Sequence, residues 1–259
     1  MLKIFDSHTH LNSKEFIGRE DEIIQQALLK AVNKINVVGT DKKTNDLAIQ
    51  YAEKYPQCYA TIGWHPDEAT LFDGESEEYL KKNLNHPRVL ALGEIGLDYH
   101  WMKAPKWLQA DVFCKQIRYS KEINKPFMVH TREALEDTYQ ILKEETIGPA
   151  GAIMHSFSAS YEEAKKFLEL GVMLSISGVV TFKKSLELQE LVKKVPLDCL
   201  LVETDAPYLS PVPFRGKENQ PAYVYHTLEK ISELREIPLE KLAEIIYQNS
   251  LRIFKLEEN

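Results

Sequence analysis

The chain has 259 residues, of which 44% are hydrophobic and 27% are charged. This composition is typical of an ordinary globular protein and excludes a collagen-like, coiled-coil or disordered chain. The 39 acidic and 32 basic side chains give a formal net charge of −7. That charge argues against the broad phosphate-neutralising surface of a non-specific duplex binder, but it still permits a local nucleic-acid site.

The predicted elements alternate in chain order between short apolar runs and amphipathic segments. We expect strands at Leu2–Phe5, Ile35–Val38, Tyr59–Gly63, Val89–Leu92, Pro126–Val129, Ala150–Met154, Val172–Ser177 and Cys199–Val202. We expect helices at Glu20–Val32, Asn45–Lys54, Glu75–Asn85, Trp107–Ile123, Arg132–Glu144, Tyr161–Leu170 and Leu186–Lys194, with two more at Pro221–Arg235 and Pro238–Phe254.

About eight apolar strands that alternate with helices predict an α/β fold in which a parallel sheet closes into a (β/α)8 barrel, a TIM barrel. Nothing in the composition divides the chain, so we expect one domain over residues 1–259. An open doubly wound sheet is the alternative. It is disfavoured because no G-x-G-x-x-G motif or P-loop follows the first predicted strand.

Other sequence features bear on location and redox state. No apolar run is long enough to cross a membrane, and Met1–Asp6 reaches a charge too early for a signal peptide, so we expect a cytosolic protein with no membrane partner. Nothing in the sequence indicates an obligate protein partner. The cysteines are far apart and form no C-x-x-C pair, which disfavours both a disulfide framework and a cysteine zinc site: Cys58, Cys114 and Cys199.

Histidines and carboxylates stand directly after the predicted strands, where a barrel builds its active site. They are His8 and His10, His65, Glu94, His130, His155, and Glu203 with Asp205. Residues at i and i+2 of a strand point to the same side, so His8 and His10 can hold one ion. The whole set offers more ligands than one tetrahedral ion requires, and two divalent cations fit the count. Zinc, magnesium and manganese all suit this mixture of ligands.

At the level of motifs, the chain resembles the TatD-type metal-dependent deoxyribonucleases, and in particular the bacterial branch that keeps the histidine pair. The resemblance covers nearly the whole chain and rests on seven ordered segments: Ile4–Asn12, Gly63–Pro66, Gly93–Tyr99, Lys125–Arg132, His155–Phe157, Val202–Leu209 and Arg215–Pro221. It implies a barrel of the amidohydrolase-like superfamily with a divalent-metal phosphodiesterase site.

The resemblance also implies a role for each ligand. One ion would be held by His8, His10, Glu94 and Asp205, and a second by Glu94, His130 and His155, with Glu94 as the bridge. The expected catalytic residues are therefore Glu94 and Asp205, because Asp205 could also accept the proton of the attacking water.

Three residues are candidates for substrate binding. Arg132 follows the fifth predicted strand and could clamp a phosphate, although a salt bridge with Glu133 or Glu136 is the alternative. His65 could contact a phosphate, hold a ligand or simply pack before the following proline. Arg215 could add positive charge above the metals, or it could lie in a solvated loop.

Three further features have weaker signals. The loop Asp98–Trp107 interleaves aromatic and basic residues, as a single-strand binding surface does, but helix packing and solvation explain the same pattern. Asp6 could orient a histidine or cap a strand end. Glu203 could reach the barrel interior, where an ion pair is its expected use.

The sequence therefore predicts a two-metal hydrolase that cleaves phosphodiester bonds of DNA, acting on a single strand or from an end. The alternative is a hydrolase of a small phosphoester, amide or lactone on the same barrel, because a fold does not fix the substrate. A binding protein with structural metals is a third possibility, which the intact ligand set disfavours.

Overall fold

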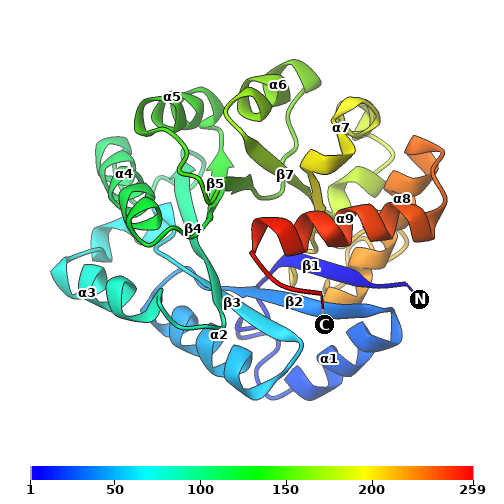
Figure 1. The fold of residues 1–259 in the computed structure, drawn as a ribbon, viewed down its shortest axis with the longest axis horizontal. Helices are drawn as coiled ribbons and strands as arrows, with labels where there is room; N and C mark the ends of the chain where they lie inside the picture. The colour runs from blue at the N-terminus through cyan, green and yellow to red at the C-terminus, as the bar shows by residue number, and fades with distance from the viewer. Residues whose placement is uncertain (1, 259) are drawn as a thin grey trace.

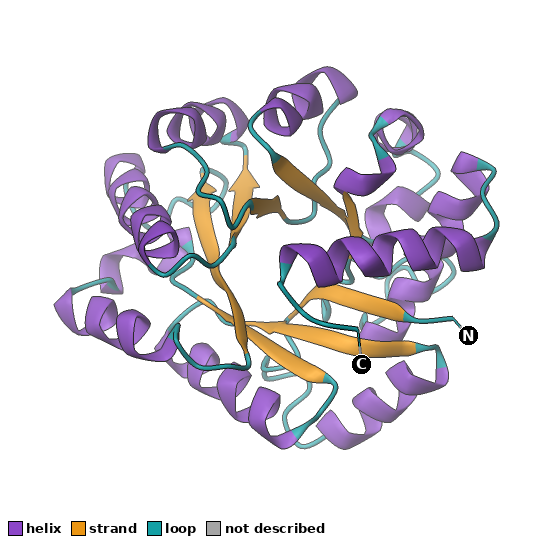
Figure 2. Ribbon diagram, viewed as in Figure 1, coloured by secondary structure: helices purple, strands orange, loops and turns teal. Residues whose placement is uncertain are grey.

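A computed structural model describes residues 2–258 as one barrel ringed by helices (Figures 1 and 2). The strands are β1 (Ile4–Thr9), β2 (Val32–Val38), β3 (Cys58–Ile62), β4 (Val89–Asp98), β5 (Phe127–Arg132), β6 (Ala152–Met154), β7 (Val172–Ile176) and β8 (Leu200–Val202). The helices are α1 (Glu20–Leu29), α2 (Lys42–Lys54), α3 (Gly74–Asn83), α4 (Lys106–Glu122), α5 (Leu135–Glu145), α6 (Tyr161–Glu169), α7 (Leu186–Lys194), α8 (Val224–Arg235) and α9 (Leu239–Ile253), with the short 3-10 helices η1 (Pro66–Leu71), η2 (Gly178–Thr181), η3 (Leu197–Cys199) and η4 (Pro221–Tyr223).

The sheet has eight strands in sequence order, and each pairs in parallel with the next. The first and last strands meet at their carboxyl ends, where the Asp205 amide donates to the His8 carbonyl at 2.9 Å and the His10 amide to the Ala206 carbonyl at 2.8 Å. This seam confirms the expected (β/α)8 barrel. It also brings the histidine pair of β1 next to Asp205 through backbone bonds.

The core has an outer and an inner part. The outer core lies between the strands and the surrounding helices, whose buried residues recur at helical spacing, as Ile23, Ile24 and Ala27 do in α1. The inner part fills the amino-terminal end of the barrel, where Phe5 and Leu90 pack with Phe254, which follows α9. Figure 1 shows α9 lying across this end of the strands. With that end filled, the carboxyl end is left for the site.

Several predicted boundaries move in the structure. β4 continues to Asp98 instead of ending at Leu92, and β1 runs to Thr9, so Glu94 and His8 lie within strands and not after them. The helix expected to reach Val32 ends at Leu29, because Ala31 takes a positive φ and Val32 begins β2. The periodicity of a short apolar run does not mark where its pairing partner stops.

Within residues 2–258, none of the helices has both the length and the apolar character needed to cross a membrane.

Candidate metal centre

A cavity of about 850 Å³ opens at the carboxyl ends of the strands. Its walls include five of the six predicted metal ligands: His10, Glu94, His130, His155 and Asp205. The sixth, His8, lies fully buried beneath them. These side chains come from β1, β4 and β5 and from the turns after β1, β6 and β8, so the barrel gathers residues that are far apart in the sequence.

Glu94 lies between two pairs of histidines. Its Oε1 is 2.9 Å from His130 Nδ1 and 2.9 Å from His155 Nε2, while its Oε2 is 3.5 Å from His8 Nε2 and 3.6 Å from His10 Nε2. One carboxylate therefore presents one oxygen to each pair, which is the geometry expected of a bridge.

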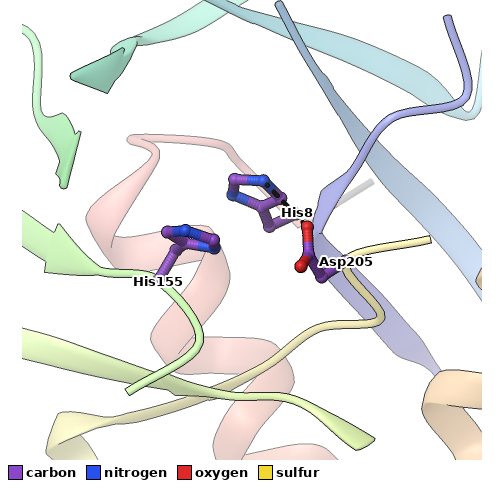
Figure 3. Close-up of side chains that lie close together, drawn as sticks. All are labelled: His8, His155 and Asp205. Atoms are coloured by element: carbon purple, nitrogen blue, oxygen red, sulfur yellow. Dashed lines mark ion pairs between the residues drawn. The ribbon is translucent and has the colours of Figure 1, made fainter. Parts of the chain in front are cut away.

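Asp205 completes the His8 and His10 side of the cluster. Its Oδ1 lies 3.6 Å from His8 Nε2 and 3.4 Å from His10 Nε2. Figure 3 shows His8, His155 and Asp205 converging, and the rings of His8 and His155 stack with centroids 4.1 Å apart. Asp205 has a φ of 55°, a left-handed conformation that aspartate tolerates better than most residues. That turn directs its carboxylate back toward β1.

The first pair of histidines is oriented by uncharged groups. His10 Nδ1 donates to the Val38 carbonyl at 3.0 Å, and His8 Nδ1 contacts Met128 Sδ at 2.9 Å. With Nδ1 engaged in both rings, the Nε2 atoms of both face Glu94 and Asp205.

The second pair is backed by buried carboxylates. His130 Nε2 donates to Asp98 Oδ2 at 3.0 Å, which leaves Nδ1 toward Glu94. His155 Nδ1 lies 3.3 Å from Glu203 Oε1, and its Nε2 faces Glu94. Glu203 is fully buried, and the same oxygen accepts the Ser156 amide at 2.8 Å. A carboxylate behind a ligating imidazole fixes its tautomer and ring orientation.

Gly96 allows β4 to approach β5 at this point. It has a φ of 145° and pairs with His130, and a Cβ there would collide with the His130 carbonyl oxygen. The close approach holds Glu94 and Asp98, on either side of Gly96, against the same imidazole ring.

The pKa values of the carboxylates and histidines in the cluster depend on one another. Burial opposes ionisation of Glu94, but the neighbouring charge of His155 and hydrogen bonds from the histidines outweigh it and hold the pKa of Glu94 well below its usual range. Burial also disfavours the imidazolium of His155, yet the charges of Glu94 and Glu203 raise its pKa well above the ordinary value. The pKa values of His10 and His130 are raised as well, whereas burial lowers that of His8. In the protein without cations, protons on His10, His130 and His155 thus balance the buried carboxylates.

The residues fit divalent cations. Two groups have ligand atoms that all lie within 4.8 Å of one another, namely His8 with His10 and Glu94, and Glu94 with His130 and His155. A third such group joins His8 and His155 to Asp205. Imidazole nitrogens and carboxylate oxygens are ligands that zinc and manganese accept, and cations there would replace the protons as the balancing charge.

His65 has a different arrangement from the other histidines. Its Nδ1 accepts the Asp67 amide at 3.1 Å at the start of η1, so in the neutral ring the proton is on Nε2. Burial, and then the neighbouring His130, lower the pKa of His65 to about 3. His65 Nε2 lies 3.8 Å from Glu94 Oε1. The ring therefore presents an N–H donor to the cavity and no lone pair for a cation.

Arg132 is the last residue of β5 and lines the cavity. The alternative salt bridges are absent: Glu133 pairs with His100 at 2.7 Å and Glu136 with Lys166 at 3.2 Å. Among residues 2–258, no carboxylate lies within ion-pair distance of the Arg132 guanidinium, which sits 5.5 Å from the centre of the Trp101 ring.

Two other candidates lie apart from the ligand cluster. Arg215 is not among the residues that line the cavity, and its guanidinium stacks on Phe182 at 4.3 Å. The Asp6 carboxylate accepts the Thr204 amide at 2.8 Å and its hydroxyl at 2.6 Å, which ties β1 to the end of β8. Asp6 thus acts as a strand-end cap.

Asp98 is the residue that sequence reasoning left without a role. Glu94, Gly96 and Asp98 alternate along β4, so the two carboxylates face the same side of the strand. This even spacing is the signal that could have found Asp98, but the strand was expected to end at Leu92.

Comparison with known proteins gives a consistent result. The family model described as TatD related DNase matches residues 5–255. Among curated proteins, the chain is 44% identical over 253 residues to the "uncharacterized metal-dependent hydrolase YabD" of Bacillus subtilis, with 98% of this chain and 99% of that protein covered. It is 36% identical over 257 residues to the similarly named YcfH of Escherichia coli K12, with 98% and 96% covered.

Solved structures agree on the fold. The crystal structure of YjjV, a TatD homologue from Escherichia coli K12, superposes with a TM-score of 0.93 at 29% identity, with 98% of each chain covered. A beta-aspartyl dipeptidase from Fervidobacterium islandicum gives a TM-score of 0.67 at 19% identity over 99% of this chain and 75% of that one. The second match shows a shared barrel and nothing about the substrate.

Proposed function

This chain belongs to the TatD-related DNase family of metal-dependent hydrolases, and on that premise we propose that it cleaves phosphodiester bonds of DNA from a strand end. The observation that carries the proposal is the shared carboxylate of Glu94 between two histidine pairs. Beside it, the same cavity contains the Arg132 guanidinium, which has no carboxylate partner in the described chain. A cation cluster next to an available guanidinium suits a phosphate ester.

Two divalent cations would share Glu94. His8, His10 and Asp205 would hold one, and His130 and His155 the other. Bound there, such cations supply activation of a water nucleophile and stabilise the charge that develops on phosphate oxygens. Zinc and manganese suit the imidazoles and carboxylates together, and magnesium is a candidate through the carboxylates.

Asp205 is the proposed proton acceptor. Its side chain is 13% exposed and lines the cavity, within reach of a water that approaches from the open side. Burial opposes its ionisation, but the hydrogen bond from His10 and the charges of His155 and His8 hold the pKa of Asp205 below its usual range. The carboxylate is therefore ionised at neutral pH and can take a proton.

Arg132 and His65 are the proposed phosphate contacts. Arg132 offers a fork of N–H donors from the end of β5, and His65 offers one neutral Nε2–H donor from the turn after β3. Neither group competes for the cations, because neither presents a lone pair to the cavity. They would position the scissile phosphate over the ligands.

The shape of the site favours a strand end over the interior of a duplex. The ligands line a cavity at the mouth of the barrel, and His8 and Glu94 are buried at its floor. A terminus can enter such a cavity, whereas continuous duplex would have to bend sharply to reach it. The alternative remains a small phosphoester, amide or lactone metabolite, which also fits a cavity of this size.

A substrate panel tests the proposal. Protein stripped of metal and then loaded with zinc, magnesium or manganese is assayed on single strands, duplexes with blocked 3′ or 5′ ends, and small phosphodiesters. We expect hydrolysis of single strands and open ends, lost on metal removal and restored by metal. Asp205→Asn, purified in parallel, controls for contaminating nucleases and should lower the rate about 10²- to 10⁴-fold. Turnover of small esters with no DNA cleavage would favour the metabolite hydrolase instead.

A further inference from the structure

Two large aromatic side chains stand exposed on the wall of the cavity. Trp101 is 58% exposed and Tyr208 is 56% exposed, and both line the cavity that contains the ligand cluster. The other cavity residues are mostly polar. Flat rings left open to solvent beside a polar centre can stack on a ligand that enters the cavity, because burying their surface is favourable.

The two rings stand on opposite sides of the mouth. Trp101 lies in the loop after β4 and Tyr208 in the loop after β8, and in a barrel whose eight strands follow sequence order these strands face each other. Tyr208 meets the ring of His10 edge-on with centroids 6.2 Å apart. The mouth of the cavity therefore has one exposed aromatic ring after each of two opposite strands.

Trp101 is held in place through the metal centre itself. Its backbone amide donates to Asp98 Oδ1 at 2.9 Å, while Asp98 Oδ2 accepts from His130. The ring of His100 packs edge-on against the indole at 4.9 Å, and Arg132 lies over it at 5.5 Å. An indole anchored at its backbone beside a guanidinium offers a planar surface and a phosphate donor side by side.

We propose that Trp101 forms a stacking subsite for one unpaired nucleobase, next to the phosphate that Arg132 holds. This inference rests on the proposed nuclease function and specifies its substrate class as single-stranded or frayed ends. A base inside a duplex already stacks on its neighbours and does not offer a free face. Every nucleobase has a planar face, so the subsite selects for an unpaired base and not for sequence.

The chain provides its own control. Trp107, at the start of α4, is 70% exposed, but it does not line the cavity. Substitution of Trp107 removes an indole that is more exposed than Trp101 and leaves the proposed subsite intact. Trp101→Phe keeps an aromatic face, and Trp101→Ala removes it. The bond to Asp98 comes from the backbone of Trp101, so all these variants retain it.

The test compares a single-stranded oligonucleotide with the same strand carrying abasic terminal residues. For the wild type and Trp107→Ala we expect kcat/KM to favour the intact strand by about 5- to 150-fold, the equivalent of about 1–3 kcal/mol of stacking. Trp101→Ala should lose this preference, and Trp101→Phe should keep most of it. In metal-free protein, intact strand should quench tryptophan fluorescence in Trp107→Phe but not in Trp101→Phe.

Two results would overturn the subsite: equal cleavage of intact and abasic strands by the wild type, or an undiminished preference in Trp101→Ala. Metal content measured on each variant shows whether a change in rate comes from the cations. Failure of the nuclease proposal would give a different result: the wild type would cleave no DNA with any of the metals.

Discussion

The two halves of the candidate metal centre hold their histidines by different means. In the half formed by β1 and the turn after β8, His8 and His10 are oriented by a thioether and a backbone carbonyl, and the negative charge comes from Asp205 beside them. In the half formed by β5 and the end of β6, the carboxylates of Asp98 and Glu203 stand behind the rings. Glu94 serves both halves.

The difference shows two ways to place charge around a cation. The first half puts its own carboxylate beside the proposed cation, where it can also take part in chemistry. In the second half, Asp98 and Glu203 lie behind the imidazoles. There they orient the ligand rings and balance charge without occupying coordination positions. Arg132 and His65 line the cavity beside this second half, where the ring of His65 lies 4.4 Å from that of His130.

The largest effect should come from the group that both halves share. Glu94→Gln preserves shape but removes the negative charge that allows two cations to sit close together. We expect loss of metal from both halves and a fall in hydrolysis larger than the 10- to 100-fold typical of losing an outer hydrogen-bond partner. Elemental analysis and steady-state assays measure this. His65→Ala is the control and should retain metal. Near-normal hydrolysis by Glu94→Gln in excess metal would point to a site without a bridge.

The next effect should be confined to one half. His8→Ala/His10→Ala removes half the ligands of one proposed cation and leaves those of the other in place. Elemental analysis should show loss of about one ion per chain from folded protein. His130→Ala/His155→Ala is the mirror experiment and should spare the first cation. Unchanged metal content in both double variants would refute the assignment of these histidines.

A smaller effect should come from the carboxylate that orients His130. Asp98→Asn removes the charge behind His130, and we expect metal affinity of the second half to fall about 10- to 100-fold, measured by chelator competition. Asp67→Asn removes the same charge from the same cavity, but the Asp67 carboxylate pairs with Lys103 and not with a ligand histidine. If both variants lose affinity equally, net charge and not ring orientation is the cause.

The smallest effect should come from the thioether behind His8. Met128→Leu removes the sulfur but conserves volume, so we expect the free energy of unfolding to fall by at most about 1.5 kcal/mol. Thermal denaturation measures this change. Metal affinity of the first half should change no more than a few-fold, since the Val38 carbonyl still orients His10. A loss as large as that of Asp98→Asn would remove the proposed contrast between the halves.

The sequence by itself determined the alternation of strands and helices and the residues that stand at the strand ends. Both are local properties: apolar periodicity sets the element, and i, i+2 alternation places His8 and His10 on one side of a strand. The ordered motifs then led to the six ligands, which the structure brings into one cluster. Whether they bind cations is left to the experiments above.

Only the tertiary structure decided how each ligand is oriented. Asp98 reaches His130 because β4 continues past its apolar run, and Glu203 reaches His155 from a strand two places along the sheet. The proton position of His65 depends on the amide of the turn that follows it. Most of these contacts join residues tens of positions apart in the sequence, and their geometry depends on strand register and barrel closure, which no local pattern of residues encodes.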